Sequence, residues 1–149
     1  MYTHIVVGTD GSPTAGEAVR HAARLAAATG ATVHVVHVFQ PVPTLAVMGI
    51  DGGAALAASG ATEEAERQAQ QVLAAAVQVA RDQGAKAEGL LAVDDPANAL
   101  LDTAERLGAD LLVVGNKGMS GVKRFVLGSV PNKVSHHCPC SLLIVNTAP

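Results

Sequence analysis

The sequence predicts an α/β protein in which a doubly wound, five-stranded parallel sheet is flanked by about four helices. Five short apolar runs rich in β-branched residues alternate with segments whose apolar residues recur at helical spacing. Strands that are apolar on both faces, with helices between them, are typical of a parallel sheet covered on both sides. In addition, Gly30-Ala31, Gly84-Ala85 and Gly108-Ala109 each stand where a helical pattern gives way to a strand pattern.

The element boundaries follow from local signals. Ser12 and Pro13 are the expected N-cap and first residue of the first helix. Asp95 and Pro96 play the same part for the third helix. Gly30, Gly84 and Gly108 end the first three helices, and residues 130–137 form a short last one. The expected strands cover residues 3–7, 32–38, 87–93, 110–114 and 141–145.

Residues 40–61 show no clear period and contain several prolines and glycines. We therefore expect a long connection there, which is either a lid over a ligand or a plain surface loop. Thr62 is the expected N-cap of the second helix, because Glu63 and Glu64 suit the positive start of a helix.

Composition limits the classes of function. A chain of 149 residues predicts one domain over residues 1–149. A net charge of −3 argues against a nucleic-acid partner, and no apolar run approaches the roughly 20 residues that span a bilayer. The first residues enter a strand pattern without a basic leader, so we expect a cytoplasmic protein. Cys138 and Cys140 are one residue apart, and this spacing favours free thiols over a disulfide.

Residues 115–129, GNKGMSGVKRFVLGS, form a glycine-rich turn between a predicted strand and a predicted helix. Glycines let backbone N–H groups approach a phosphate, and a helix start adds unpaired N–H groups. Lys117, Lys123 and Arg124 supply cations. The stretch matches neither the P-loop nor the dinucleotide fingerprint. It predicts nucleotide binding.

The turn at residues 8–10 lies at the carboxyl end of the first strand, as the 115–129 stretch lies at that of the fourth. In doubly wound folds the ligand binds beyond the carboxyl ends of the strands, where the strand order reverses. If the first and fourth strands are neighbours, the two turns are opposite walls of one crevice.

Several segments resemble the universal stress protein family: VVGTDGS at 6–12, HVF at 37–39, LLVVGNKGMSG at 111–121, LGSVPNKV at 127–134 and the closing HHCPCSLLIV. The resemblance covers the whole length. The spacing of Gly115, Gly118, Gly128 and Ser129 is typical of the ATP-binding branch of that family. The resemblance implies a Rossmann-like fold, similar to the adenine nucleotide alpha hydrolases, with strand order 3-2-1-4-5.

The resemblance also implies roles. Asp10 would lie near the ribose or a phosphate-bound Mg²⁺, Val38 would contact the adenine, and Ser129 would face the phosphates. The strand Ser141–Val145 would pair with its copy in a second chain to form a homodimer. The full set of implied nucleotide-binding residues is Gly8, Thr9, Asp10, Val38, Gly115, Asn116, Lys117, Gly118, Gly121, Gly128, Ser129, Val130 and Pro131.

Simpler interpretations stand beside these roles. Asp10 can be a turn former, and Ser129 can be the N-cap of the last helix. Asp94 departs from the glycine that family members often carry, and Asp94-Asp95 is read as loop and cap. The cluster His136, His137, Cys138 and Cys140 fits no common zinc spacing, and a helix end with histidines at its negative pole is the simpler account.

The sequence provides no convincing general base, so we expect a stress-response or signalling protein that changes shape or partner on binding ATP. The alternatives are a sensor of AMP or cyclic AMP, or a weak, self-phosphorylating ATPase. An ATP-consuming ligase would show a Ser/Gly-rich turn where this chain has GTDGS, and a flavin carrier would show more aromatic residues. A purely structural dimer is the last alternative.

Overall fold

The computed structural model describes residues 1–39, 52–117 and 127–147. Its strands are β1 (His4–Thr9), β2 (Thr32–Val38), β3 (Lys86–Ala92), β4 (Leu111–Gly115) and β5 (Ser141–Val145). Its helices are α1 (Pro13–Thr29), α2 (Gly52–Asp82), α3 (Pro96–Leu107) and α4 (Ser129–His137). The predicted alternation of strands and helices is confirmed, and most strand bounds shift by one or two residues.

The five strands form one parallel sheet in the order β3-β2-β1-β4-β5. The predicted fold class and strand order are therefore confirmed. β1 pairs with β2 on one side and with β4 on the other, with Val7 opposite Val35 and Val113. The strand order reverses between β1 and β4, so the turns that follow these two strands lie next to each other.

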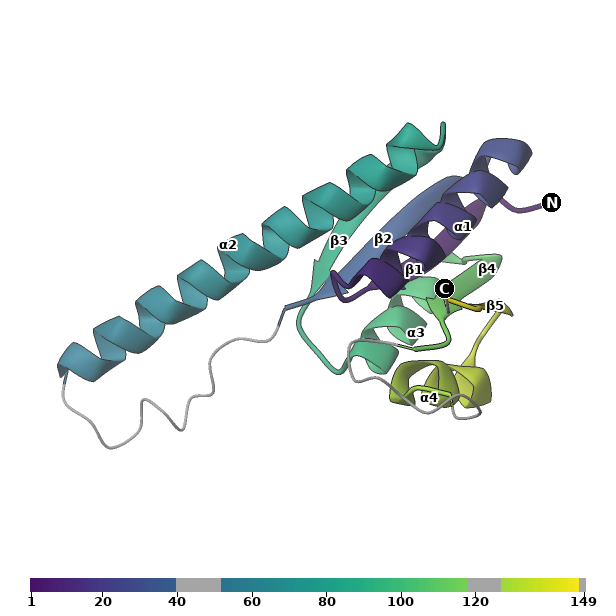
Figure 1. Ribbon diagram of the computed structural model, residues 1–149. Helices are drawn as coiled ribbons and strands as arrows, with labels where there is room; N and C mark the ends of the chain where they lie inside the picture. Colours follow the sequence, from purple (N-terminus) through teal and green to yellow (C-terminus); the bar gives the residue numbers. More distant parts are fainter. Residues whose placement is uncertain (40–51, 118–126, 148–149) are drawn as a thin grey trace.

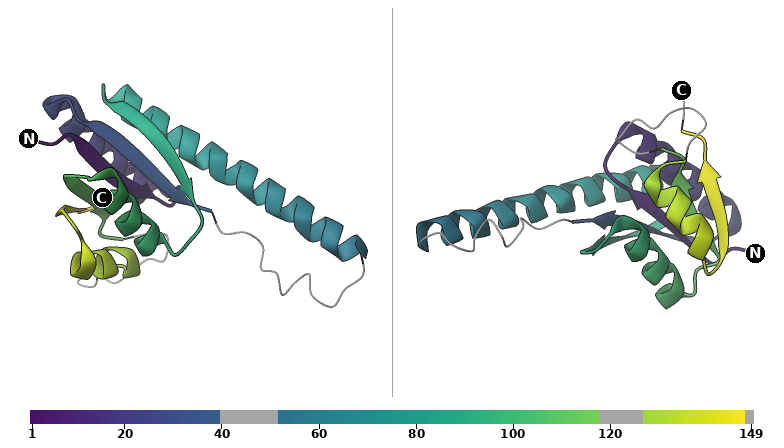
Figure 2. Two further views of the ribbon diagram at one scale, coloured as in Figure 1. Left: turned by 180° about the vertical axis from the view of Figure 1, so that it is seen from behind. Right: turned by 90° about the horizontal axis from the view of Figure 1, so that it is seen from below.

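Helices cover both faces of the sheet: α1 and α2 on one side, α3 and α4 on the other (Figures 1 and 2). The alternation of side chains along β1 explains the two layers. Ile5 and Val7 are fully buried against α1 and α2, whereas Val6 is fully buried against α3 and α4. Because aromatic residues are nearly absent, the buried residues of both core clusters are Val, Leu, Ile and Ala, whose short side chains pack closely.

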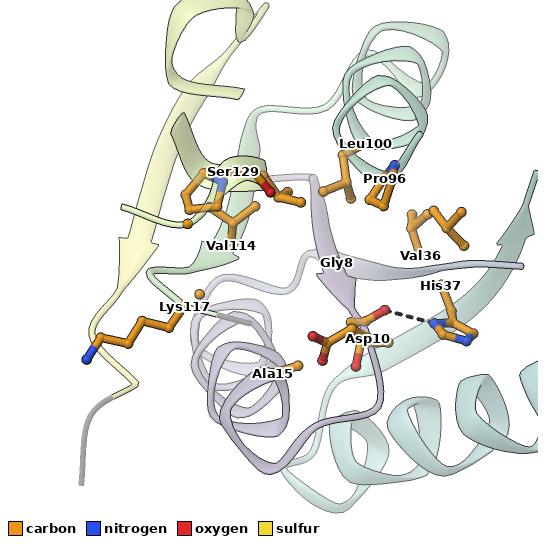
Figure 3. A pocket seen from close by; sticks show the side chains of 16 residues that line it. Gly8, Asp10, Ala15, Val36, His37, Pro96, Leu100, Val114, Lys117 and Ser129 are labelled. Atoms are coloured by element: carbon orange, nitrogen blue, oxygen red, sulfur yellow. Dashed lines mark hydrogen bonds between the residues drawn. The ribbon is translucent and has the colours of Figure 1, made fainter. Parts of the chain in front are cut away.

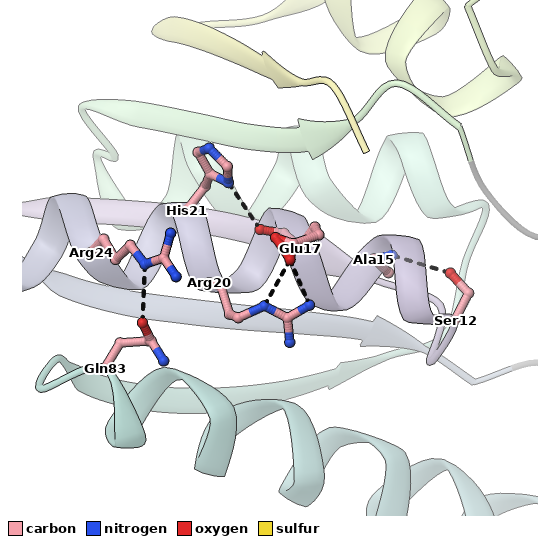
Figure 4. Close-up of polar contacts among 7 residues, drawn as sticks. All are labelled: Ser12, Ala15, Glu17, Arg20, His21, Arg24 and Gln83. Atoms are coloured by element: carbon pink, nitrogen blue, oxygen red, sulfur yellow. Dashed lines mark hydrogen bonds and ion pairs between the residues drawn. The ribbon is translucent and has the colours of Figure 1, made fainter. Parts of the chain in front are cut away.

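α1 begins as the sequence predicts. The Ser12 hydroxyl accepts a hydrogen bond from the Ala15 amide at 3.2 Å, and Pro13 is the first helical residue. The helix ends at Gly30, whose φ of 79° is the left-handed conformation that glycine adopts without strain. Farther along α1, Arg24 Nε donates to Gln83 Oε1 at 3.1 Å and joins α1 to the end of α2 (Figure 4).

The predicted start of α2 is wrong. The helix begins at Gly52, well before the expected N-cap Thr62, so part of the expected 40–61 connection is helical. The segment is rich in alanine, the strongest helix former, and Gly60 weakens a helix without ending it. The first turns of α2 extend past the end of the sheet (Figures 1 and 2). The rest of the expected connection, residues 40–51, lies outside the described residues.

α3 and α4 cover the face that carries Val6 and Leu112. The Asp95 carboxylate caps α3 by accepting from the Asn98 amide at 3.1 Å, as predicted. The same carboxylate accepts from Lys133 Nζ of α4 at 3.1 Å, so one side chain joins the two helices. Among the described residues, no helix is both long enough and apolar enough to cross a bilayer.

Candidate functional site

A cavity of about 750 Å³ opens at the carboxyl ends of β1, β2 and β4, where the strand order reverses (Figure 3). The starts of α3 and α4 close its other sides. Its size lies in the range of ligand sites, about 300–1,000 Å³. The residues that line it are Gly8, Thr9, Asp10, Ala15, Val36, His37, Val38, Pro96, Leu100, Val114, Gly115, Lys117, Gly128, Ser129, Val130 and Pro131.

The turn after β1 supplies the first wall. Gly8 leaves no room for a side chain, since a Cβ there would lie 2.9 Å from Leu100 Cδ1. Asp10 Oδ1 accepts from the Ser12 amide at 2.9 Å, and Thr9 Oγ1 accepts from the Gly11 amide at 3.2 Å. Asp10 therefore forms the turn, as the simpler interpretation states, and it also lines the cavity.

His37, near the end of β2, is a lining residue that was not in the implied binding set, although it lies in the matching segment HVF at 37–39. Its Nδ1 lies 2.9 Å from the Thr9 carbonyl oxygen, which fixes the ring against the turn after β1 (Figure 3). A carbonyl oxygen only accepts, so Nδ1 carries the proton and donates. In the neutral ring, Nε2 is then an acceptor. The sequence signal available for His37 was its position beside Val38, at the end of a predicted strand.

The opposite wall joins β4 to α4. The Gly128 amide donates to the Asn116 carbonyl at 3.0 Å, which brings the two ends of the glycine-rich stretch together. Gly115 and Lys117 line the cavity from the β4 side, and Gly128 lines it from the α4 side. Residues of the turn after β1 and of the glycine-rich stretch thus line the same cavity, as the sequence predicted for the two walls of one crevice.

α4 starts at Ser129, and Gly128 is its N-cap, with no side chain bonded to the helix start. The interpretation of Ser129 as N-cap is therefore wrong by one position. The first amides of a helix have no partner within it, and Pro131 has no N–H to donate. Ser129, Val130 and Pro131 line the cavity, so this helix start lies at its wall.

Asn116 was predicted with the site, but it is not among the lining residues. Its side-chain Oδ1 accepts from both the Thr147 amide, at 3.0 Å, and the Thr147 hydroxyl, at 2.9 Å. It thereby positions the chain after β5 against the glycine-rich stretch. Gly118 and Gly121 lie outside the described residues.

Apolar side chains were the largest omission from the sequence prediction. Val36, Val38, Leu100 and Val114 come from three different elements, β2, α3 and β4, and line the cavity. We call these four residues the apolar part of the cavity. Val38 was in the implied binding set, whereas Val36, Leu100 and Val114 belong to hydrophobic runs that read equally well as core, so the sequence held no separate signal for those three.

Two other candidates lie apart from the cavity. The Asp94 carboxylate accepts from the Asp95 amide at 2.6 Å and is not a lining residue. Cys138 and Cys140 are free, half-buried thiols in the layer beneath α3 and α4. Across the residues that the structure describes, no group of three or more His, Cys, Asp or Glu side chains is placed to hold a metal ion.

The fold and the cavity define a doubly wound α/β protein with a cavity at its topological switch point. The universal stress protein family model matches residues 1–146. Universal stress protein YxiE of Bacillus subtilis is 33% identical over 147 residues, which cover 97% of this chain and 99% of that protein. The chain belongs to the universal stress protein family.

Solved structures agree with this membership. A universal stress protein in complex with cAMP is 32% identical, with a TM-score of 0.72, and covers 99% of this chain and 98% of that one. The universal stress protein from Archaeoglobus fulgidus in complex with dAMP is 26% identical, with a TM-score of 0.67, and covers 96% and 97%.

Proposed function

We propose that this chain binds an adenine nucleotide in the cavity, with ATP as the preferred ligand, and acts in stress signalling by changing its shape or partner on binding. The observation that carries the proposal is the division of the cavity. One part is apolar, and another presents a helix start, glycine backbone and a lysine. A nucleotide has the same division, between its base and its phosphates.

The apolar part suits the base. Val38 is the last residue of β2 and follows Val36 and His37 in that strand, and all three residues line the cavity. Methyl groups of Val36, Leu100 and Val114 would pack against the faces of a purine ring. Burial of the ring is favourable by roughly 25 cal/mol per Å² of apolar surface. Among the described lining residues there is no Phe, Tyr or Trp ring that would stack on a flavin.

The start of α4 suits the phosphates. The N–H groups of Ser129 and Val130 and the positive end of the helix dipole favour an anion. Gly128 has no side chain to obstruct its approach, and Lys117 lines the same cavity. Among the described lining residues, Asp10 is the carboxylate that would meet a phosphate-bound Mg²⁺, because Mg²⁺ prefers oxygen ligands.

The related structures support the class of ligand. One is a complex with cAMP and the other a complex with dAMP, and both ligands are adenine nucleotides. The preference for ATP rests on the long glycine and serine spacing from Gly115 to Ser129, which resembles the ATP-binding branch.

We infer binding without dedicated turnover. The described lining residues include no arginine, and the Asp10 and His37 side chains both form hydrogen bonds with the turn after β1. Slow hydrolysis of ATP would follow from helix N–H groups and a bound Mg²⁺ alone, because such groups stabilise phosphoryl transfer.

Isothermal titration calorimetry with ATP, ADP, AMP and cyclic AMP tests the proposal, with GTP as the control for the base. We expect ATP to bind and GTP to bind more weakly. Mass spectrometry of ligand released from freshly purified protein should find an adenine nucleotide. Binding of none of these nucleotides would overturn the proposal, and tighter binding of cyclic AMP would replace ATP by the sensor alternative.

We also propose a homodimer through β5. In the described sheet β5 is an edge strand that pairs with β4 alone. Its sequence, SLLIV, is apolar, and an apolar edge strand is a ready template for pairing with a second chain.

A further inference from the structure

The side chains of Cys138 and Cys140, for which the sequence spacing favoured free thiols over a disulfide, point their sulfur atoms toward each other. Cys138 Sγ and Cys140 Sγ are 3.9 Å apart, which is close to van der Waals contact between two sulfur atoms. Cys138 ends α4, Cys140 immediately precedes β5, and Pro139 stands between them. A disulfide bond is about 2.05 Å long, so bond formation requires the sulfur atoms to approach by roughly 1.9 Å.

We propose that Cys138 and Cys140 form an oxidisable dithiol, which a hydroperoxide converts to a disulfide within one chain. No part of this proposal depends on nucleotide binding. The two thiols are the only cysteines of the chain, and both are half-buried rather than fully enclosed. A small oxidant can therefore reach them. A disulfide between the two thiols of one chain should form more readily than a disulfide with a thiol of a second protein.

The chemistry balances with hydrogen peroxide as the oxidant. The first sulfur, as thiolate, attacks one peroxide oxygen: an S–O bond forms, the O–O bond breaks, and the leaving hydroxide takes a proton to become water. The second thiol loses its proton and attacks the resulting sulfenic sulfur. The S–S bond forms, the S–O bond breaks, and a second water leaves. The two sulfur atoms are oxidised and the two peroxide oxygens are reduced.

The surroundings assign the order of the two steps. Burial raises the pKa of the Cys140 thiol to about 11, and the neighbouring Cys138 adds to this rise. Because the thiolate is the nucleophile, Cys140 is a poor group to attack peroxide at neutral pH. Cys138 takes the first step, and Cys140 resolves the sulfenic acid that forms next to it. The resolving step should accelerate as the pH rises.

The product should be easily reduced. A disulfide between two residues separated by a single proline closes a small ring, and strained disulfides are the labile ones. The bond would join the end of α4 to the start of β5 by a covalent link. We therefore expect a reversible modification rather than a structural cross-link.

Peroxide treatment followed by alkylation and peptide mass spectrometry tests the proposal. The peptide that contains both cysteines should lose two hydrogen atoms and take up no alkylating reagent. Dithiothreitol should restore it to the doubly alkylated form. Two alkylated cysteines after peroxide treatment would overturn the proposal, as would sulfinic acid at either site or a disulfide between two chains.

Serine variants test the order of the steps without changing side-chain size. Cys140→Ser should leave a sulfenic acid on Cys138 that dimedone labels. Cys138→Ser should leave Cys140 largely alkylatable under the same treatment. Dimedone labelling of Cys140 in the second variant, with none on Cys138 in the first, would overturn the assigned order.

Discussion

His4 Nδ1 lies 3.1 Å from His34 Nε2, so two imidazole rings on the neighbouring strands β1 and β2 share a hydrogen bond. The other nitrogen of His34 lies 3.6 Å from the Glu88 carboxylate of β3. His34 is only 5% exposed. One ring must donate and the other must accept, so this hydrogen bond requires that the accepting ring be neutral.

The stability of the fold should fall in mild acid because of this pair. Burial lowers the pKa of His34, the nearby His4 lowers it further, and Glu88 opposes the shift. The unfolded chain then binds more protons than the folded one once the pH falls below about 6.5. We expect the free energy of unfolding to be highest above this pH and to decrease toward the lowered folded pKa. A single proton limits the slope to about 1.4 kcal/mol per pH unit.

Urea unfolding between pH 7.5 and 5, with wild type and two variants, measures the contribution of His34. His34→Gln keeps a polar side chain at this position and removes the titration, so the dependence on pH should become shallower. His21→Gln is the matched control, because His21 is exposed on α1. Equal slopes for His34→Gln and wild type would show that other groups cause the dependence.

Gly128→Ala should weaken nucleotide binding without weakening the fold. Gly128 has φ −60° and ψ 165°, a conformation open to alanine, and an added Cβ would meet no atom closer than 3.5 Å. A methyl group there would instead face a ligand phosphate. We expect a loss of at least tenfold in ATP affinity, about 1.4 kcal/mol, measured by calorimetry, with an unchanged melting temperature.

Gly60→Ala is the control for that variant. Gly60 is an exposed glycine of α2, and an added Cβ would meet nothing within 4 Å. It should keep full ATP affinity and equal or greater stability. Full affinity in both variants would mean that no phosphate approaches Gly128.

Gly8→Ala should reduce the cavity itself. The new Cβ would lie 2.9 Å from Leu100 Cδ1, so the Leu100 side chain, which lines the cavity, would have to shift. We expect a stability cost of about 1 kcal/mol and a larger loss of ligand affinity. Adding Leu100→Val, which removes one methylene, should recover part of both losses in a double-mutant cycle. Strictly additive effects would contradict the predicted contact.

Asp95 should matter more as a helix cap than as an ion-pair partner. Its pKa is lowered first by the Asn98 amide and then by Lys133, so its contribution is present above its ordinary pKa and is lost in acid. Asp95→Ala should cost about 1 kcal/mol, measured by urea unfolding at pH 7. Asp95→Asn keeps the cap and loses only an exposed ion pair, which is worth about 0–1 kcal/mol. Equal costs for both variants would make the ion pair dominant.

The proposed homodimer predicts a particle of twice the chain mass of 15.0 kDa. Light scattering coupled to size-exclusion chromatography measures this directly over a range of concentrations. A particle of single-chain mass at high micromolar concentration would rule out a stable dimer through β5.

The sequence was sufficient for the fold because apolar runs and helix caps are local signals. Ser12, Asp95, Gly30 and Gly108 act as predicted. The start of α2 was missed because Thr62 followed by acidic residues imitates a helix start, while alanine-rich sequence before it also forms a helix.

The sequence predicted those cavity-lining residues that lie in recognisable motifs. Both glycine-rich turns were found, but Leu100 has no motif, and His37, although it lies in the matching segment HVF, was given no role before β2 was placed. Asn116 was assigned to the ligand with its neighbours in the glycine-rich stretch, whereas its partner is Thr147, 31 residues away in the chain. Such long-range hydrogen bonds are not visible in a local pattern.

The central pairing of β1 with β4 has a consequence for synthesis on the ribosome. Ile5 lies opposite Leu111, so the strand that is made first waits for most of the chain before it gains its second neighbour. The cavity also needs Ser129 to Pro131, which emerge later still. The cavity is therefore incomplete until Pro131 has left the ribosome, and the non-local pairing makes folding comparatively slow.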